Sequence, residues 1–170
     1  MKSLFFPSSL EVVVQTQPLR YWQLTASSKG LSRLRLVAEC GEDSTKPYAF
    51  LVEAREQIQA YFAGRLRRFE LPLDWSGATD FYRAVWRALL EVPYGQTSSY
   101  LAIARRIGKP KAVRAVGQAN RNNPLPIIVP CHRILASNGK LHGFYYGLEM
   151  KRQLLALENP SVYGRQLCLL

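Results

Sequence analysis

Apolar and polar residues alternate along two neighbouring runs near the start of the chain. The runs cover residues 20–26 and 31–38, and Ser27-Ser28-Lys29-Gly30 between them is a turn signal. A period of two is typical of strands that bury one face. A short β-type run at 10–16 precedes them. The pattern therefore predicts a strand at 10–16 followed by a β-hairpin.

The period then changes from two to about four. Between residues 49 and 62 apolar side chains recur at helical spacing, and Gly64 follows them, which predicts a helix that Gly64 ends. The stretch 71–77 has no period and reads as a loop. We place a domain boundary there. Residues 1–77 then form a small α/β scaffold domain and residues 78–170 a second domain.

Two helices are expected at the start of the second half. Thr79 precedes a run whose apolar residues recur at i, i+4 and i+8, so it is the predicted N-cap of the first helix. Thr97 is the predicted cap of the second helix, which runs to residue 106. Pro93-Tyr94-Gly95 separates the two.

A tight turn at residues 108–110 joins that second helix to a third, over residues 112–121. Two short helices with a Gly-containing turn between them are a helix-turn-helix candidate. Such pairs are also common packing units, so the pattern leaves DNA binding open. The last helix combines basic and small residues, which would let its backbone approach DNA closely: Lys111, Arg114, Ala115, Gly117, Ala119 and Arg121.

A stiff apolar segment leads to a cysteine and a histidine side by side. Pro124, Pro126 and Pro130 fix φ and remove backbone donors, so this segment cannot be helical. The β-branched run 127–129 between them predicts a buried, extended chain. It ends in Cys131-His132-Arg133.

Cys131 is a candidate nucleophile, a candidate metal ligand or a packing residue. A thiol with a pKa of about 8.5 needs a base or a positive charge to become the attacking thiolate. His132 is a natural base, although adjacent residues of an extended chain point apart, which favours contact through a water. His132 would then need a carboxylate on its other nitrogen. A lone cysteine after an apolar run is most often a core residue, and zinc ligation with His142 lacks the usual ligand spacing.

The end of the chain offers a turn and a last helix. Ser137-Asn138-Gly139-Lys140 is a hairpin-type turn, and an aromatic loop at 144–147 follows. Residues 148–158 have the pattern of a helix. A charged helix position is usually solvated, and from the pattern alone Glu158 reads that way.

Composition narrows the class of protein. The 170 residues carry a formal charge of +11, which favours a polyanion such as nucleic acid or an anionic membrane surface. A solvated basic surface remains the alternative. Three scattered cysteines indicate a reducing compartment rather than a disulfide framework or zinc ribbon. No apolar run approaches the ~18 residues of a membrane span, and the N-terminus lacks a signal peptide, so we expect a cytoplasmic protein without a membrane partner.

These motifs together resemble the O6-alkylguanine-DNA alkyltransferases, the methylated-DNA–protein-cysteine methyltransferases. The resemblance is close over residues 79–159 and thinner over about 20–75. It rests most specifically on Pro130-Cys131-His132-Arg133, and further on the runs at 92–100, 114–120 and 147–158. The family implies an α+β chain of two domains, with an RNase H-like N-terminal domain and a winged-helix-like helix-turn-helix C-terminal domain.

The resemblance also implies a reaction and roles for the residues that match. Cys131 would irreversibly take the alkyl group from O6-alkylguanine, or O4-alkylthymine, in DNA. His132 would be its base, Glu158 would orient His132, and Tyr100 would protonate the leaving base with help from Lys151. The implied DNA-binding residues are Arg114, Ala115, Gly117, Thr97, Ser99 and Asn123. The implied substrate pocket is lined by Pro126, Ile134, Tyr145, Tyr146 and Asn120.

The implied partner is double-stranded DNA, bound in the minor groove without sequence preference, by a protein that can act as a monomer. No cofactor is expected. Cys40 stands without partners for the zinc site of some N-terminal domains, and Tyr146 replaces a usual glycine in the pocket loop. The main alternative function is an alkyltransferase-like protein that binds lesions without repair, a class that lacks the nucleophilic cysteine. A helix-turn-helix transcription factor with a structural cysteine is a third.

Overall fold

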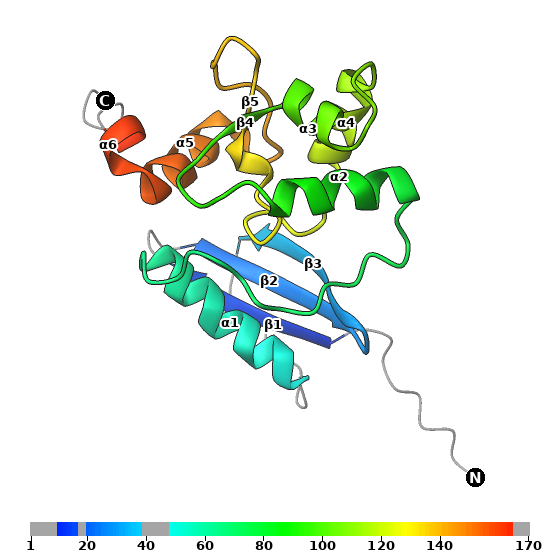
Figure 1. Ribbon diagram of the computed structural model, residues 1–170. Coiled ribbons are helices and arrows are strands. Elements are labelled where there is room, and N and C mark those ends of the chain that lie inside the picture. Colours follow the sequence, from blue (N-terminus) through cyan, green and yellow to red (C-terminus); the bar gives the residue numbers. More distant parts are fainter. Residues whose placement is uncertain (1–9, 17–19, 39–47, 165–170) are drawn as a thin grey trace. The chain divides into compact units, whose positions relative to one another are not determined.

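The computed structural model describes residues 10–16, 20–38 and 48–164, and the chain divides into two compact units, Met1–Ser76 and Gly77–Leu170 (Figure 1). Cys40 and Cys168 lie outside the described residues. Among the described helices, none combines the length and apolar character that crossing a membrane requires.

The first unit is a three-stranded antiparallel sheet with one helix. Strands β1 (Leu10–Thr16), β2 (Arg20–Ser27) and β3 (Gly30–Val37) lie in that order, and α1 (Ala49–Phe62) packs along the sheet (Figure 1). The predicted strand, hairpin and helix are confirmed. Alternation along β2 buries Trp22 and Leu24, and β3 buries Leu31 and Leu34 on either side of a register shift between the two strands. The buried face of α1 carries Leu51, Ala54, Ile58 and Tyr61.

The loop after α1 is partly held against β3. The backbone N–H of Leu31 donates to the carbonyl of Pro72, and the N–H of Asp74 donates to the carbonyl of Leu31, at 2.8 and 2.7 Å. The contact depends on Gly30, where φ is +148° and a Cβ would come within 2.5 Å of the Pro72 oxygen. A larger residue there would push this loop away from β3.

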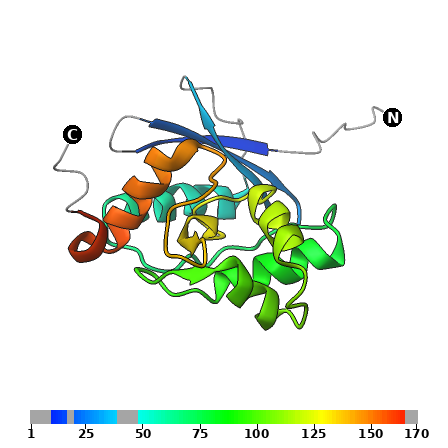
Figure 2. The same cartoon turned by 90° about the horizontal axis from the view of Figure 1, so that it is seen from above.

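The second unit is helical, with one short parallel pair of strands. Its helices are α2 (Asp80–Leu90), α3 (Tyr100–Arg106), α4 (Val113–Arg121), α5 (Gly147–Glu158) and α6 (Pro160–Tyr163). Strands β4 (Ser98–Ser99) and β5 (Ile134–Leu135) pair in parallel. Helices α3 and α4 lie side by side and α4 packs on α2 (Figure 2), where the indole N–H of Trp86 donates to the carbonyl of Ala119 at 2.8 Å.

Of the two N-cap residues predicted for α2 and α3, the structure confirms one. Thr79 caps α2 as predicted, and its hydroxyl accepts from the N–H of Tyr82. The predicted cap at Thr97 is wrong: Ser99 caps α3 and accepts from the N–H of Ala102 at 3.1 Å. The helix starts later because Ser98 and Ser99 are held extended by their pairing with β5.

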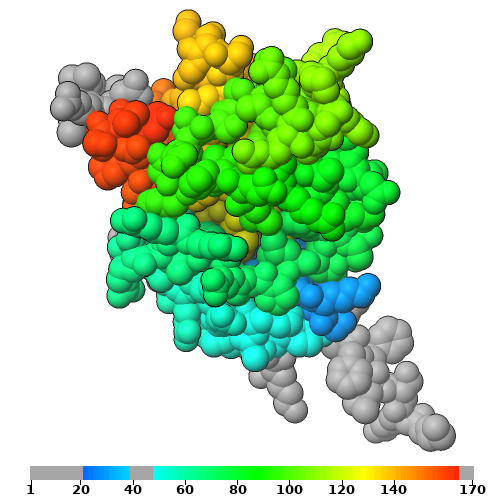
Figure 3. Space-filling model, in the orientation of Figure 1, coloured from blue at the N-terminus to red at the C-terminus, as the bar shows by residue number. Residues whose placement is uncertain are grey.

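One further prediction was wrong in its backbone geometry. The run 127–129 is buried but not extended, because Ile127 has a φ of +75° and the N–H of Val129 turns back to the carbonyl of Leu125 at 2.8 Å. The predicted hairpin-type turn at 137–140 forms, with the N–H of Ala136 donating to the carbonyl of Lys140 at 3.1 Å, and it stands out at the surface (Figure 3). No strand follows it in the described chain, and β5 pairs with β4.

Candidate functional site

Cys131 lies at the start of a short 3-10 turn, Cys131–Arg133, rather than on the extended chain expected from the sequence. Its side chain is almost completely buried, at 4% exposure. Burial raises the pKa of the thiol, while the nearby Asn123 amide and the Lys151 ammonium act in the opposite direction. The thiol is therefore protected from solvent, and a neighbouring group must take its proton before it can attack.

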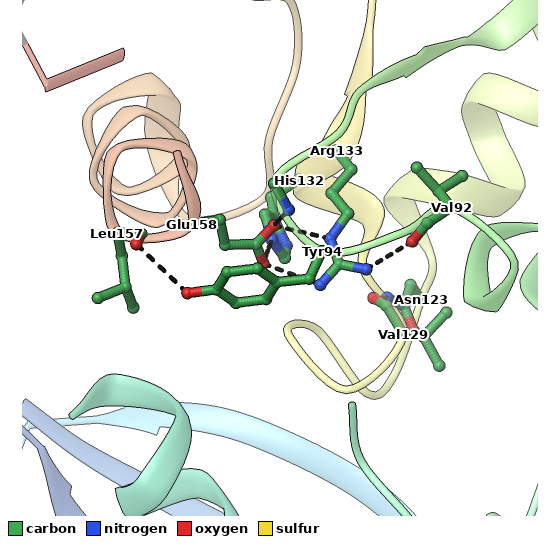
Figure 4. Close-up of polar contacts among 9 residues, drawn as sticks. Val92, Tyr94, Asn123, Val129, His132, Arg133, Leu157 and Glu158 are labelled. Atoms are coloured by element: carbon green, nitrogen blue, oxygen red, sulfur yellow. Dashed lines mark hydrogen bonds and ion pairs between the residues drawn. The ribbon is translucent and has the colours of Figure 1, made fainter. Parts of the chain in front are cut away.

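His132 meets the end of α5 through a buried hydrogen bond. Its Nε2 lies 2.8 Å from Oε1 of Glu158, and both side chains are completely buried (Figure 4). Burial lowers the pKa of His132, against the opposing effect of Glu158. The other ring nitrogen, Nδ1, is buried and has no hydrogen-bond partner among the described residues. A neutral His132 that donates through Nε2 keeps a lone pair on Nδ1 for a further proton.

The Glu158 carboxylate also receives a bidentate ion pair. Arg133 donates from Nε to Oε2 at 2.8 Å and from Nη2 to Oε1 at 2.9 Å, and its Nη1 donates to the carbonyl of Val92 at 2.6 Å (Figure 4). The Gly95 N–H donates to Oε2 as well. Burial alone would raise the pKa of Glu158, but the bonds from His132 and the charge of Arg133 hold it well below its usual range.

Arg133 was not among the candidate site residues. The sequence did contain a signal for it: Arg133 directly follows two residues that were candidates for a buried site. If its guanidinium is buried with them, it needs a carboxylate as partner. The sequence offered no way to choose that carboxylate. Glu158, 25 residues further on, meets it only through the path of α5.

The turn before Cys131 is stabilised by asparagine side chains. Asn123 donates to the carbonyl of Val129 at 2.8 Å and accepts from the N–H of Leu125 at 3.0 Å, so it closes the segment that contains Pro124 and Pro126. Asn120, on α4, lies 3.5 Å from the carbonyl of Cys131. The oxygen of the Asn120 side chain is buried without a partner among the described residues. Helix α4 thus contacts the cysteine turn directly.

Tyr100 and Lys151 meet at one backbone carbonyl, that of His142. The Tyr100 hydroxyl lies 3.4 Å from this oxygen and the Lys151 ammonium 2.9 Å from it. Lys151 also donates to the carbonyls of Ile134 and Gly143, and its burial lowers its pKa to about 8. Burial, with the nearby Cys131, raises the pKa of Tyr100. Both groups are held beside the loop that follows β5.

The predicted DNA-binding residues lie on or next to the helix-turn-helix pair. Arg114 and Ala115 are exposed near the start of α4, and a Cβ added at Gly117 would be 4.0 Å from the ring of Tyr100. Thr97 is exposed before β4, and Ser99 is engaged as the cap of α3.

The predicted pocket residues differ in exposure. Pro126 and Ile134 are buried, whereas Tyr145 is 72% exposed and Tyr146 is half-buried. Tyr146 makes edge-on ring contacts to Phe144 and Tyr145, with centroids 6.1 and 5.0 Å apart. The described residues contain no group of three or more histidine, cysteine, aspartate or glutamate side chains placed to hold a metal ion.

Comparison with family models gives one family for both units. Residues 80–160 match the 6-O-methylguanine DNA methyltransferase DNA binding domain, and residues 16–75 match the ribonuclease-like domain of the same family. These matches confirm the predicted fold class, an α+β chain with a ribonuclease-like and a DNA-binding domain.

Similar proteins and solved structures belong to the same family as the family models. A methylated-DNA–protein-cysteine methyltransferase of Methanosarcina barkeri is 49% identical over 79% of this chain and 82% of its own length. One of Mycolicibacterium paratuberculosis is 47% identical over 83% and 87%. The crystal structure of the O6-methylguanine methyltransferase of Mycobacterium tuberculosis superposes with a TM-score of 0.78 at 41% identity, over 89% of this chain and 93% of that one. The structure of Mycobacterium tuberculosis OGT in complex with DNA gives 0.76 at 41% identity, over 89% and 92%.

Proposed function

The chain belongs to the 6-O-methylguanine DNA methyltransferase family, and from this premise we propose that it repairs DNA by direct reversal, taking the alkyl group of O6-alkylguanine onto Cys131. The observation that carries the proposal is the buried Cys131–His132 turn, in which Glu158 holds one imidazole nitrogen and leaves the other unbonded. The same reaction would accept O4-alkylthymine. It is a single-turnover transfer, because the carbon–sulfur bond that forms is not broken again.

The step is one displacement. His132 takes the Cys131 proton on Nδ1 through a bridging water, as expected from the sequence. Glu158 accepts a hydrogen bond from Nε2 and stabilises the imidazolium that forms. The thiolate sulfur attacks the alkyl carbon, the carbon–oxygen bond breaks, and the bonding electrons stay with the guanine oxygen. Tyr100 donates a proton to the leaving base, and Lys151 assists by its charge and by fixing the loop next to Tyr100.

DNA is the partner, through the second unit. We assign residues 78–170 as the DNA-binding and alkyl-transfer domain and residues 1–77 as the scaffold. An O6 atom inside a stacked duplex is out of reach, so the nucleotide must be extruded, at a few kcal/mol. Arg114 fills the space left in the stack, and small residues on α4 allow close approach in the minor groove. The DNA-contacting set is Arg114, Ala115, Gly117, Thr97, Ser99 and Asn123.

The proposal includes a substrate pocket and no cofactor. The pocket is lined by Pro126, Ile134, Tyr145, Tyr146 and Asn120. Phosphate contacts suit repair in any sequence context, which the formal charge of +11 supports. One transfer per chain needs no second subunit, so a monomer suffices, and a cytoplasmic protein without a metal fits this chemistry. Stoichiometric zinc in the purified protein would contradict the metal-free assignment.

A transfer assay with mass spectrometry tests this function. Incubation with a duplex that contains O6-methylguanine is expected to add one methyl group per chain, located on Cys131. The Cys131→Ala variant is expected to bind the same duplex and gain no methyl group. Binding by the unaltered chain without any adduct would instead indicate an alkyltransferase-like lesion-binding protein.

A further inference from the structure

Arg133 has no part in the displacement described above, yet its side chain is buried and each of its three nitrogens donates a hydrogen bond. It makes two hydrogen bonds to Glu158 and one to the carbonyl of Val92, at 7% exposure, and its guanidinium lies 5.8 Å from the ring centre of Tyr94 (Figure 4). Replacing a buried ion pair by apolar residues of similar volume is often neutral or stabilising. Stability alone is therefore a weak reason for this arginine.

The charges around His132 indicate a second reason. Glu158 and Lys151 face it from α5, Arg133 comes from its own turn, and the Cys131 thiol is its neighbour. Lys151 is already bonded to three backbone carbonyls, so the carboxylate that touches His132 is compensated by Arg133. A buried carboxylate without that compensation would draw a proton onto the imidazole, because unbalanced charge is unfavourable in a poorly solvated site.

We propose that Arg133 is a positioning residue that keeps His132 neutral, by balancing the charge of Glu158, so that Nδ1 can accept the Cys131 proton. This inference rests on the proposed transfer reaction. With Arg133 present, the charges of Glu158, Arg133, His132 and Cys131 sum to zero, and moving the proton from sulfur to nitrogen leaves that sum unchanged. Without Arg133, His132 takes a proton from solvent and must lose it before it can serve as the base.

The transfer rate as a function of pH tests the proposal. Arg133→Met removes the charge at similar length, Arg133→Lys keeps it, and Arg152→Met is the matched control, because Arg152 pairs with Glu149 on the exposed side of α5. Single-turnover rates with a methylated duplex are measured between about pH 5.5 and 9, across the range in which histidine titrates. The midpoint of the curve of rate against pH is expected to lie at least about one pH unit higher for the Met variant than for the unaltered chain. The Lys variant and the control are expected to have midpoints close to that of the unaltered chain.

A loss of rate by the same factor at every pH, equal in the Met and Lys variants and with the midpoint unmoved, would overturn the proposal. It would leave Arg133 a packing role only. The control variant guards against a general effect of lost positive charge on DNA binding, which would lower the rate without moving the midpoint.

The protonation state of the imidazole can be measured without DNA. The chain has two histidines, His132 and His142, so nitrogen NMR of the rings gives two sets of signals, which a His142→Gln variant assigns. His132 of the unaltered chain is expected neutral at pH 6, with its proton on Nε2, and charged in Arg133→Met. A charged His132 in the unaltered chain at pH 6 would refute the inference even where the Met variant fails to fold. If the chain transfers no alkyl group, the proposed function fails, and this measurement still decides the role of Arg133.

Discussion

The two units bury different kinds of residue. In the first unit the buried side chains of the described residues are apolar, whereas the second unit also buries Asn120, His132, Arg133, Lys151 and Glu158. Their charges differ as well: residues 77–170 hold 13 of the 23 basic residues but 4 of the 12 acidic ones, a formal charge of +9 against +2 for residues 1–76. Buried ionisable groups cost free energy unless they are paired. Their concentration in the second unit supports the proposal that this unit performs the chemistry and that the first unit is a scaffold.

The largest expected effect is on the transfer rate, and it compares a carboxylate with a lowered pKa in each unit, Glu158 in the second and Asp74 in the first. Glu158→Gln removes the charge that stabilises the imidazolium of His132, and we expect the transfer rate to fall roughly 100-fold or more, the usual contribution of general acid–base catalysis. Single-turnover transfer from a methylated duplex measures it. A fall of less than threefold would separate Glu158 from the reaction.

Asp74 is the matched carboxylate of the first unit. Hydrogen bonds from Ser27 and Ser76 lower its pKa from 3.8 to about 2. Asp74→Asn is expected to leave the transfer rate unchanged. The stability that the ionised Asp74 contributes is present above about pH 4 and is lost as the pH falls towards 2. The unaltered chain should therefore be more stable than the variant above about pH 4, and acid unfolding should show this difference disappear between about pH 4 and 2.

A second comparison uses two glycines in the left-handed region. Gly95 has a φ of +74°, and an added Cβ would lie 3.0 Å from the carbonyl oxygen of Glu158, whereas Gly64 has a φ of +70° and open space around it. Alanine should cost about 1 kcal/mol at Gly64, from the backbone alone, and about 2–3 kcal/mol at Gly95, where the loop must also move. Urea unfolding measures both. Equal costs would contradict a close approach between the loop and the end of α5.

A third prediction concerns the width of the substrate pocket. Tyr146 places a ring, in contact with those of Phe144 and Tyr145, where the family usually has a glycine. Tyr146→Gly should raise the rate with O6-benzylguanine DNA roughly tenfold relative to O6-methylguanine DNA, the scale of a changed steric fit. Second-order rates with both substrates measure the ratio. The idea fails if the unaltered chain repairs both adducts equally fast, or if the variant leaves the ratio unchanged.

The smallest effect expected is on the salt dependence of DNA binding. Arg114 belongs to the +9 unit and Arg68 to the +2 unit, and both are exposed. Each phosphate contact contributes about one to the slope of log affinity against log salt. A guanidinium inserted in the duplex also neutralises phosphate charge, so Arg114→Ala should reduce the slope by about one, and Arg68→Ala should leave it unchanged. Equal reductions would indicate that both units contact DNA.

Local periodicity predicted the structure correctly wherever the conformation depends on residues that are close in the sequence. The bounds of α1, the hairpin of β2 and β3 and the Thr79 cap follow from side chains within a few residues of each other. The same local information failed before Cys131. The β-branched Ile127 favours an extended chain, yet the Leu125–Val129 hydrogen bond closes a turn around it and holds it at positive φ.

The features of the site can likewise be separated into those that the sequence determined and those that depend on the tertiary structure. The sequence by itself determined the pair of Cys131 and His132, the need for a carboxylate, and the basic helix with small residues. The residue pattern alone left Glu158 as a solvated helix position, and the family resemblance named it as the partner of His132. Tertiary structure decided that Glu158 is buried, because its burial depends on where α5 ends. It also brought in Arg133 as the partner of Glu158. Contacts between residues 25 or more positions apart depend on the path of the whole unit, which no local pattern encodes.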